Sequence, residues 1–525
     1  MATRLPRSET PHPRTRDLDR LGAAGLVDLL HACDLEVFDG VCVPNVLDAL
    51  RDFSVLLTEA HRAGMRRVVL AGAGTSGRLA HLIAARHAAS CQASGVQLVP
   101  WIAGGARALL HAVEGAEDDV VAIRHELAQH LDAQTIYVGI SCGLSAPCVA
   151  AGVLEAHARG STTVVFGTND PATARRAPLT GLPGGFAQAL ELVDCVLAPD
   201  VGFEPLTGSS RMKGGTATWL CLDAVLHAFA CALAPLVQGD CTREVLRDRI
   251  ASRIERSRSL AEASFAGEGR TRRIVAIEAA AASIRGGGCL RVVGRGEPGL
   301  AAVLDASECQ PTFGVEPDRV RAFAASPPRE LYDEDVGLDA AREELERLDA
   351  RDCLIVVRED GWTEDVATAA RVVQIDCEEM LDAKLTLNAI STSAFVLAGK
   401  VFGNRMIDVA LSNAKLFDRA VRIVADVAHV SEPEAKRSVV AVLHCQDEPS
   451  SEILELSVHE HLEHARLENV SRSGVVPRAV LHARGVRLGA AEAILSTHPV
   501  VRDAIDATAL RDPESRRTPP GSRSS

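Results

Sequence analysis

The chain has 525 residues, a formal net charge of −14 and 47% hydrophobic residues. This length exceeds a single hydrophobic core, so two or three domains are expected. An acidic surface repels polyanions, and aromatic residues make up only 3% of the chain, which argues against nucleic-acid binding and anionic membranes. A small anionic ligand is compatible with this charge, because it needs only a local group of donors.

The termini and the cysteines indicate the cellular compartment. The first 17 residues are rich in Pro and Arg and lack the apolar run of a secretory signal. The fourteen cysteines are scattered without a C-x-x-C pair, which points to neither zinc nor a disulfide framework. We predict a cytoplasmic protein with reduced core cysteines and with no metal or cofactor, and nuclear entry stays open if the source is eukaryotic.

Short β-branched runs, each followed by a glycine- or serine-bearing turn, recur in the first half. Buried parallel strands are predicted at residues 67–71, 135–140, 162–166 and 195–198. The apolar run at 214–239 has the length of a membrane span, but Asp223 and His227 favour a buried core helix. Residues 246–284 are helical in period and end at Gly286-Gly-Gly288, where we place the boundary between two lobes.

The second half repeats this order. Residues 290–294 parallel the strand at 67–71, residues 352–357 parallel the strand at 135–140, and residues 385–390 resemble residues 220–225. Three correspondences in the same order indicate a duplication. We therefore predict an α/β protein with two doubly wound parallel sheets, each an αβα sandwich, and a small C-terminal helical lid. The predicted divisions are a disordered tail at 1–17, a first sheet domain with N-terminal helices at 18–245, a second at 246–430, the helical lid at 431–510 and a disordered tail at 511–525.

The most informative motif is Gly72-Ala-Gly-Thr-Ser-Gly-Arg78, which follows a strand and opens a helix. Glycines allow the tight turn, the first helical amides point toward an anion, and Thr75 and Ser76 add hydroxyl donors. The motif has neither the Lys of a nucleotide P-loop nor the acidic ribose partner of a dinucleotide fold. A phosphate group held by residues 74–77, from Gly74 to Gly77, is the functional interpretation, and a packing turn is the alternative.

Two further loops present hydroxyl groups at helix starts. One contains Ser141, Gly143 and Ser145, and the other contains Ser209 and Ser210, followed by two cationic residues. Each loop taken singly can be read as a capped helix start. Three such loops in one lobe are better explained by a shared polar ligand.

These motifs resemble the sugar isomerase (SIS) domain family, in the branch that holds N-acetylmuramic acid 6-phosphate etherases and glucokinase regulatory proteins. The strings that carry the resemblance are Ala73-Gly-Thr-Ser-Gly-Arg78, Ile102-Ala-Gly-Gly105, Val113-Glu-Gly-Ala-Glu-Asp118 and Thr207-Gly-Ser-Ser-Arg-Met-Lys-Gly-Gly-Thr216. Tandem SIS-type sheets, a helical lid and Gly143-Leu-Ser-Ala-Pro147 follow the regulatory pattern, whereas etherases of this branch are single-domain homodimers.

The resemblance implies that the two halves have divided the functional residues. The second half keeps the catalytic string Asp305-Ala-Ser-Glu308-Cys309, whereas the first half has Arg86 at the position of its glutamate. In the second half, the corresponding loop carries Glu297, whose charge repels a phosphate, and Pro298, which removes a backbone donor. Arg86 lies ten residues after Ser76, about 15 Å along a helix, so a glutamate at such a position must act across an interface. One composite site with Glu308 is therefore predicted; a surface carboxylate is the alternative.

By the same resemblance, Glu117 matches a second catalytic acid/base, Glu114 matches a sugar-hydroxyl ligand, and Lys384 matches a residue that reaches the ligand. Two carboxylates that face one sugar suit an elimination, in which one removes a proton and the other protonates the leaving oxygen. The same pair can simply accept hydrogen bonds from sugar hydroxyls. Lys384 can equally be a surface charge.

The sequence thus leaves three functions open. The first is a regulator that senses fructose 6-phosphate-like ligands and controls a partner such as a hexokinase- or glucokinase-type kinase. The second is a carbon–oxygen lyase that cleaves N-acetylmuramic acid 6-phosphate, and the third is a ligand-binding protein without a partner. The fusion of two SIS-type domains, the unequal division of functional residues between them and the lid favour the regulator. Against it, the stretch before Lys384 lacks the aromatic-rich insertion that this resemblance implies.

Overall fold

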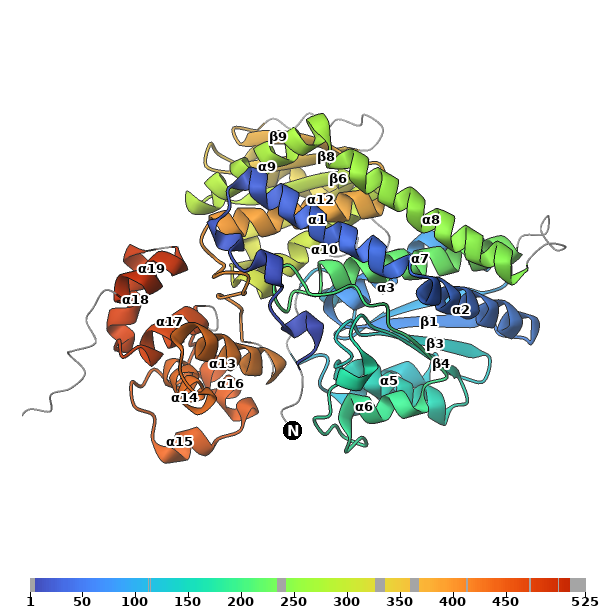
Figure 1. The fold of residues 1–525 in the computed structure, drawn as a ribbon, viewed down its shortest axis with the longest axis horizontal. Coiled ribbons are helices and arrows are strands. Elements are labelled where there is room, and N and C mark those ends of the chain that lie inside the picture. The colour runs from blue at the N-terminus through green and yellow to red at the C-terminus, as the bar shows by residue number, and fades with distance from the viewer. Residues whose placement is uncertain are drawn as a thin grey trace, which may run out of the picture. The chain divides into compact units, whose positions relative to one another are not determined.

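A computed structural model describes the protein at residues 5–111, 113, 115–233, 242–325, 336–358, 368–411, 414–471, 474–498 and 500–509. The chain forms two compact units (Figure 1). The first comprises Met1–Leu397 with Gly403–Arg405, and the second comprises Ala398–Phe402 with Met406–Ser525.

The first unit contains two parallel sheets, as predicted. The five-stranded sheet has the order β2-β1-β3-β4-β5, and the four-stranded sheet has the order β7-β6-β8-β9, which repeats the arrangement of the first four strands. The strands are β1 (Arg67–Gly72), β2 (Gln97–Ile102), β3 (Thr135–Ile140), β4 (Thr162–Phe166), β5 (Cys195–Leu197), β6 (Leu290–Arg295), β7 (Val320–Ala325), β8 (Cys353–Arg358) and β9 (Arg371–Asp376).

Helices cover both faces of each sheet, because the inner strands β1, β3, β6 and β8 are buried on both sides. In the first sheet, Val69, Ala71 and Tyr137 pack against α4, α5 and α6, while α3 packs on the opposite face of β1 and β2. In the second sheet, Val293 and Phe323 pack against α11, while α10 and α9 contact other parts of the sheet. The helices are α3 (Gly74–Gln92), α4 (Val120–Ala128), α5 (Pro147–Ala158), α6 (Gly185–Ala189), α9 (Gly267–Arg285), α10 (Gly296–Phe313) and α11 (Leu338–Glu346).

Further helices join the two sheets. Helix α1 (Ala23–Val41) contacts α7 (Lys213–Leu233), α9 and α12 (Met380–Leu397), as Figure 1 shows. Helix α8 (Arg243–Ser264) packs on α7 and α2 (Pro44–Arg62), although the sequence placed most of it in the second domain. The predicted helical stretch is thus two helices.

The sequence predicts a buried core helix at residues 214–239, and the described residues of this run confirm it. Helix α7 has the length and composition of a membrane span, but 72% of its most apolar window is buried inside the protein. Asp223 is buried there with two cationic partners, Arg86 and Arg253. Every cysteine among the described residues is free, and most are buried.

The prediction of a disordered tail at 1–17 is wrong for residues 5–17. Ser8, His12 and Thr15 are buried, and the segment contains short 3-10 helices at Arg7–Glu9 and Pro13–Thr15. Gly208 donates its backbone N–H to the Ser8 carbonyl at 2.8 Å, and Thr15 Oγ1 donates to the Pro205 carbonyl at 2.8 Å. Pro and Arg content did not reveal that distant loops supply these partners. The C-terminal tail predicted at 511–525 lies outside the described residues.

The second unit is helical, as predicted for the lid, but it begins before residue 431. On α13, Phe417, Ala420, Val424 and Val427 form a buried stripe with helical spacing against α14 and α17. Helix α14 begins at a capping box formed by Ser431 and Glu434. The helices are α13 (Ala414–Ala428), α14 (Glu432–Leu443), α15 (Ser451–Glu455), α16 (Val458–Leu467), α17 (Val475–Ala483), α18 (Leu488–Thr497) and α19 (Val501–Ala509).

Candidate functional site

The loop between β1 and α3 forms a tight turn at the carboxyl edge of the first sheet. Gly74 has a φ of +50°, which favours glycine, and α3 begins there. A Cβ on Gly77 would lie 2.5 Å from Ile102 Cγ1, so only glycine lets the helix approach β2 this closely. Thr75 and Ser76 are half-buried in the first turn of the helix, where backbone amides attract anions.

The structure brings the loop after β1, the loop after β3 and the first turns of α7 together. Ser76 Oγ lies 3.9 Å from Cys142 Sγ, which in turn lies 3.5 Å from Thr218 Oγ1 on α7. A Cβ on Gly215 would lie 3.5 Å from the Thr75 methyl group. The loop after β1, the loop after β3 and the start of α7 therefore face one small region.

In the loop after β3, Ser141 has a structural role in addition to any ligand contact. Its Oγ accepts hydrogen bonds from the backbone of Ser145 at 3.1 Å and of Ala146 at 3.2 Å. These bonds close the turn that contains Gly143 and Leu144 and leads into α5. Gly143 and Ser145 are half-buried.

The loop at residues 208–213 contributes an unsatisfied hydroxyl. Ser209 is 4% exposed, and its Oγ finds no hydrogen-bond partner among the residues that the structure describes. Leaving a buried polar group unpaired costs about 1–3 kcal/mol, so this hydroxyl fits a bound polar ligand. Ser210 beside it is half-buried.

The two cations of this loop bind protein groups. Lys213 is fully buried, and its Nζ lies 2.6 Å from Glu36 Oε2 on α1. Arg211 Nη1 lies 2.6 Å from Asp305 Oδ1 on α10. The carboxylate of Glu204 accepts the backbone N–H groups of Lys213 and Gly214, both at 2.9 Å, and burial raises its pKa to about 7. Sequence reasoning missed Glu204, because nothing in its local pattern marks it.

Glu308 contacts the first-lobe helix. The guanidinium of Arg78 donates to Glu308 Oε1, and also to the Leu109 carbonyl at 2.9 Å. Arg78 is 4% exposed and Glu308 is 9% exposed, so the alternative of a surface carboxylate is wrong. Arg78 follows Ser76 by two residues in α3, so Glu308 contacts the same helix whose first turn carries the hydroxyl groups.

Lys384 is fully buried, so the alternative of a surface charge is also wrong. Its Nζ donates to the carbonyls of Arg211 at 2.9 Å and Met212 at 3.3 Å, and to Thr216 and Asn388. Burial lowers the pKa of Lys384 to about 8. A Cβ on Gly215 would lie 3.3 Å from Lys384 Cε and 3.5 Å from the Thr75 methyl group, so Lys384 and Thr75 approach the same glycine.

Of the remaining predicted carboxylates, Glu117 lies on a segment beside the Gly104 turn. A Cβ on Gly104 would lie 3.0 Å from Val113 Cβ and 3.1 Å from Ala116 Cβ, so the segment packs closely there. Glu117 is half-buried and near Cys148, whose pKa is raised first by burial and then by this carboxylate. Glu114 lies outside the described residues.

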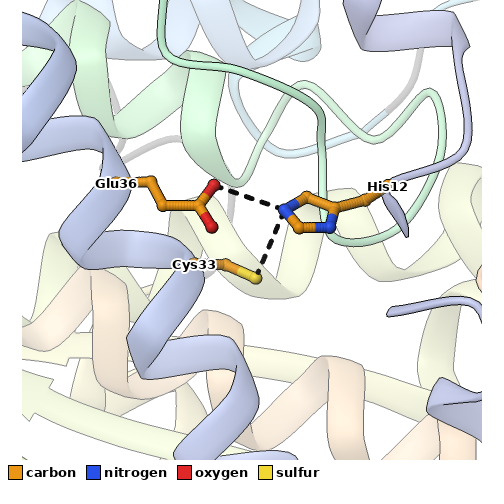
Figure 2. A group of neighbouring side chains, drawn as sticks. All are labelled: His12, Cys33 and Glu36. Carbon is orange, nitrogen blue, oxygen red and sulfur yellow. Dashed lines mark hydrogen bonds and ion pairs between the residues drawn. The ribbon is translucent and has the colours of Figure 1, made fainter. Parts of the chain in front are cut away.

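A separate group of side chains has the composition of a metal site. His12, Cys33 and Glu36 converge, with His12 Nε2 3.3 Å from Glu36 Oε2 and 3.9 Å from Cys33 Sγ (Figure 2). His12 Nδ1 accepts the Arg14 backbone N–H at 3.1 Å, so in the neutral ring the proton is on Nε2, the atom that a metal would need.

The charges around this group also favour ion pairing over metal binding. Burial alone would raise the pKa of Glu36, but hydrogen bonds from His12 and Lys213 lower it to about 2. Burial raises the pKa of the Cys33 thiol to about 12, which opposes a thiolate ligand. We interpret the group as an anchor that ties the N-terminal segment and Lys213 to α1.

The chain is similar to known proteins over both sheets and the lid. The sequence profile of the glucokinase regulatory protein N-terminal SIS domain matches residues 51–157, and that of the C-terminal lid domain of glucokinase regulatory protein matches residues 403–505. The glucokinase regulatory protein of Homo sapiens is 27% identical over 98% of this chain and 94% of its own length. The N-acetylmuramic acid 6-phosphate etherase of Actinobacillus succinogenes is 33% identical over 47% of this chain and 73% of its own length. Among solved structures, the tagatose-6-phosphate ketose/aldose isomerase of Escherichia coli matches 72% of this chain and 94% of its own, with 12% identity and a TM-score of 0.41.

Proposed function

Because the chain belongs to the family of glucokinase regulatory proteins and N-acetylmuramic acid 6-phosphate etherases, we propose that it is a sugar-phosphate-binding regulator of a sugar kinase. The extent of the similarity supports this choice, since it runs through both sheets and the lid for the regulatory proteins but over less than half of the chain for the etherase. The ligand is a fructose 6-phosphate-like sugar phosphate.

One observation carries the ligand site: a buried Ser209 hydroxyl with no partner among the described residues, next to loops that already share contacts. The phosphate group would take hydroxyl donors from Thr75, Ser76, Ser209 and Ser210 and amide donors from the start of α3. Glu308 and Glu117 would accept hydrogen bonds from the sugar hydroxyls. Arg78 holds the Glu308 carboxylate in place from the lobe that binds the phosphate.

Two measurements test this function. Purified protein is heated with a panel of hexose and amino-sugar phosphates, and a ligand that binds only the folded state should raise the unfolding temperature. The protein is then added to a glucokinase assay with and without the best ligand. A kinase rate that changes with the protein, in a ligand-dependent way, supports the regulator; a thermal shift without any effect on kinase supports a binding protein without this partner.

The second candidate is etherase activity, which the buried Glu308 at the first-lobe helix keeps open. In that case Glu308 and Glu117 would transfer the two protons of the elimination. Incubation with N-acetylmuramic acid 6-phosphate, followed by an assay for lactate, separates the two functions. Glu308→Gln would abolish lactate release from a lyase, whereas in a regulator, which has no turnover to lose, it would alter sugar binding and selectivity.

A further inference from the structure

Two ion pairs join the opposite ends of α3 and α10. Near the start of α3, Arg78 pairs with Glu308, which lies late in α10. Near the end of α3, Arg86 pairs with Glu297 at the start of α10, with Nη1 2.6 Å and 2.5 Å from the two carboxylate oxygens. The two helices therefore run antiparallel, and each end of the pair carries one charged contact.

The second ion pair occupies the counterpart of the proposed ligand site. Aligning Gly72 with Gly294 places Thr75 opposite Glu297 and Arg86 opposite Glu308. Glu297 also accepts the backbone N–H of Met380 at 3.2 Å, in the first turn of α12. Thus the Glu297 carboxylate takes an amide donor at a helix start and a guanidinium, which are the donors that a bound anion would use.

Arg86 is held firmly on its other side. Its Nε lies 3.1 Å from Asp223 Oδ1, and Asp223 is also bound by Arg253 at 2.8 Å and His87 at 2.9 Å. Burial alone would raise the pKa of Asp223, but hydrogen bonds from His87 and Arg253 hold it well below its usual range. Arg86 also lies over the Trp219 ring, 5.6 Å from its centroid.

The middle of the helix pair is open to solvent. A pocket of about 170 Å³ lies there; its apolar lining includes Leu82, Ala85, Ala88, Leu300, Val303 and Leu304, and both alanines are exposed. The side chains of α3 and α10 therefore leave this part of the interface without close apolar contacts, whereas the two ion pairs supply contacts at its ends.

We propose that the Arg86–Glu297 pair is a built-in substitute for a second ligand, and that it sets the register in which Glu308 meets Arg78. Arg86 and Glu297 are then positioning residues for the first site, although neither touches its ligand. The inference rests on the proposed function in so far as it concerns sugar-phosphate affinity.

The test introduces Arg86→Met and Glu297→Gln separately, each into the natural chain and into Glu308→Gln. Calorimetry with fructose 6-phosphate, or the panel sugar phosphate that binds best, should show dissociation constants raised about tenfold by each change in the natural chain. In a chain that already carries Glu308→Gln, neither Arg86→Met nor Glu297→Gln should raise the dissociation constant further, because both act through Glu308. Arg272→Met is the matched control, since Arg272 pairs with Glu268 and Asp376 on the surface.

A second readout needs no ligand. Amide hydrogen exchange at residues 303–309 should become faster in Arg86→Met and Glu297→Gln and stay unchanged in Arg272→Met. If Arg86→Met does not fold, the test rests on Glu297→Gln, because the Glu297 side chain is partly exposed. Unchanged affinity with only a lower unfolding temperature, or an equal further loss in Glu308→Gln, would overturn the proposal. If the natural chain binds no sugar phosphate, the proposed function fails by itself, and unchanged exchange at residues 303–309 overturns the positioning role independently.

Discussion

Arg211 Nη1 lies 2.6 Å from Asp305 Oδ1, and both side chains are buried. This ion pair connects the loop of Ser209 and Ser210 to α10, three residues before Glu308. Asp305 also accepts a hydrogen bond from Asn388 on α12 at 2.7 Å. One carboxylate thus ties together the two sheets at the level of the candidate site.

Replacing Asp305 should strongly destabilise the protein. Asp305→Ala leaves the buried Arg211 guanidinium without its counter-charge, which costs about 3–5 kcal/mol of unfolding free energy. Chemical denaturation measures this loss. Arg351→Ala breaks the exposed pair with Asp349 and should change the free energy of unfolding little. Equal effects of the two changes would contradict the role of Asp305 as a bridge between the sheets.

Removing loop hydroxyl groups should weaken ligand binding without unfolding the protein. Ser76→Ala combined with Ser210→Ala should raise the dissociation constant of fructose 6-phosphate at least about tenfold, since each hydrogen bond to a charged phosphate contributes about 1.5–3 kcal/mol. Calorimetry checks the affinity, and Ser496→Ala on the exposed face of α18 is the control. An unchanged affinity in the double variant would exclude this loop as the phosphate site.

The asymmetry of the two sheets predicts one bound ligand per chain. The second loop carries Glu297, whose carboxylate is already held by Arg86, and Pro298, which lacks an amide donor. Calorimetry on fully folded protein should give a stoichiometry of one. A stoichiometry of two would show that the second loop still binds a sugar phosphate.

The lid should lose stability in mild acid. His444 Nε2 lies 2.9 Å from His461 Nδ1, and its ring stacks on His464 with centroids 4.1 Å apart. Burial, with the charges of His464 and His461, lowers the pKa of His444 to about 4 from an ordinary value of about 6.5. Between these values the unfolded lid binds a proton that the folded lid does not, so the free energy of unfolding falls as the pH falls from about 6.5 toward 4.

Hydrogen exchange of the lid helices at pH 7, 6 and 5 measures this dependence. His444→Phe keeps an aromatic ring against His464 but has no titrating group, so the dependence should become shallower. His459→Gln changes an exposed histidine and should leave the slope as it is. An unchanged slope in His444→Phe would assign the acid sensitivity to other groups.

Much of the local structure could be predicted from the sequence. Residues 135–140 and 162–166 are strands with the predicted bounds, because buried β-branched runs bounded by turn residues have few other stable conformations. The turn at Gly74 was equally predictable, since its positive φ favours glycine. The sequence places the start of the lid after α13, which is too late. The buried stripe on α13 has the period of any amphipathic helix, so it does not reveal which of the two units the helix packs against.

Short stretches of the chain already indicate the two parallel sheets, the helical lid and the hydroxyl-bearing loops, because each depends on periodicity and turn chemistry. The family resemblance also points to Glu308 and the altered second loop. That Glu308 meets Arg78, that Arg86 meets Glu297 and that residues 5–17 are ordered follows only from the packing of the folded chain. These contacts join residues far apart in the chain, and whether two charges pair there depends on how the sheets pack, which local patterns do not encode.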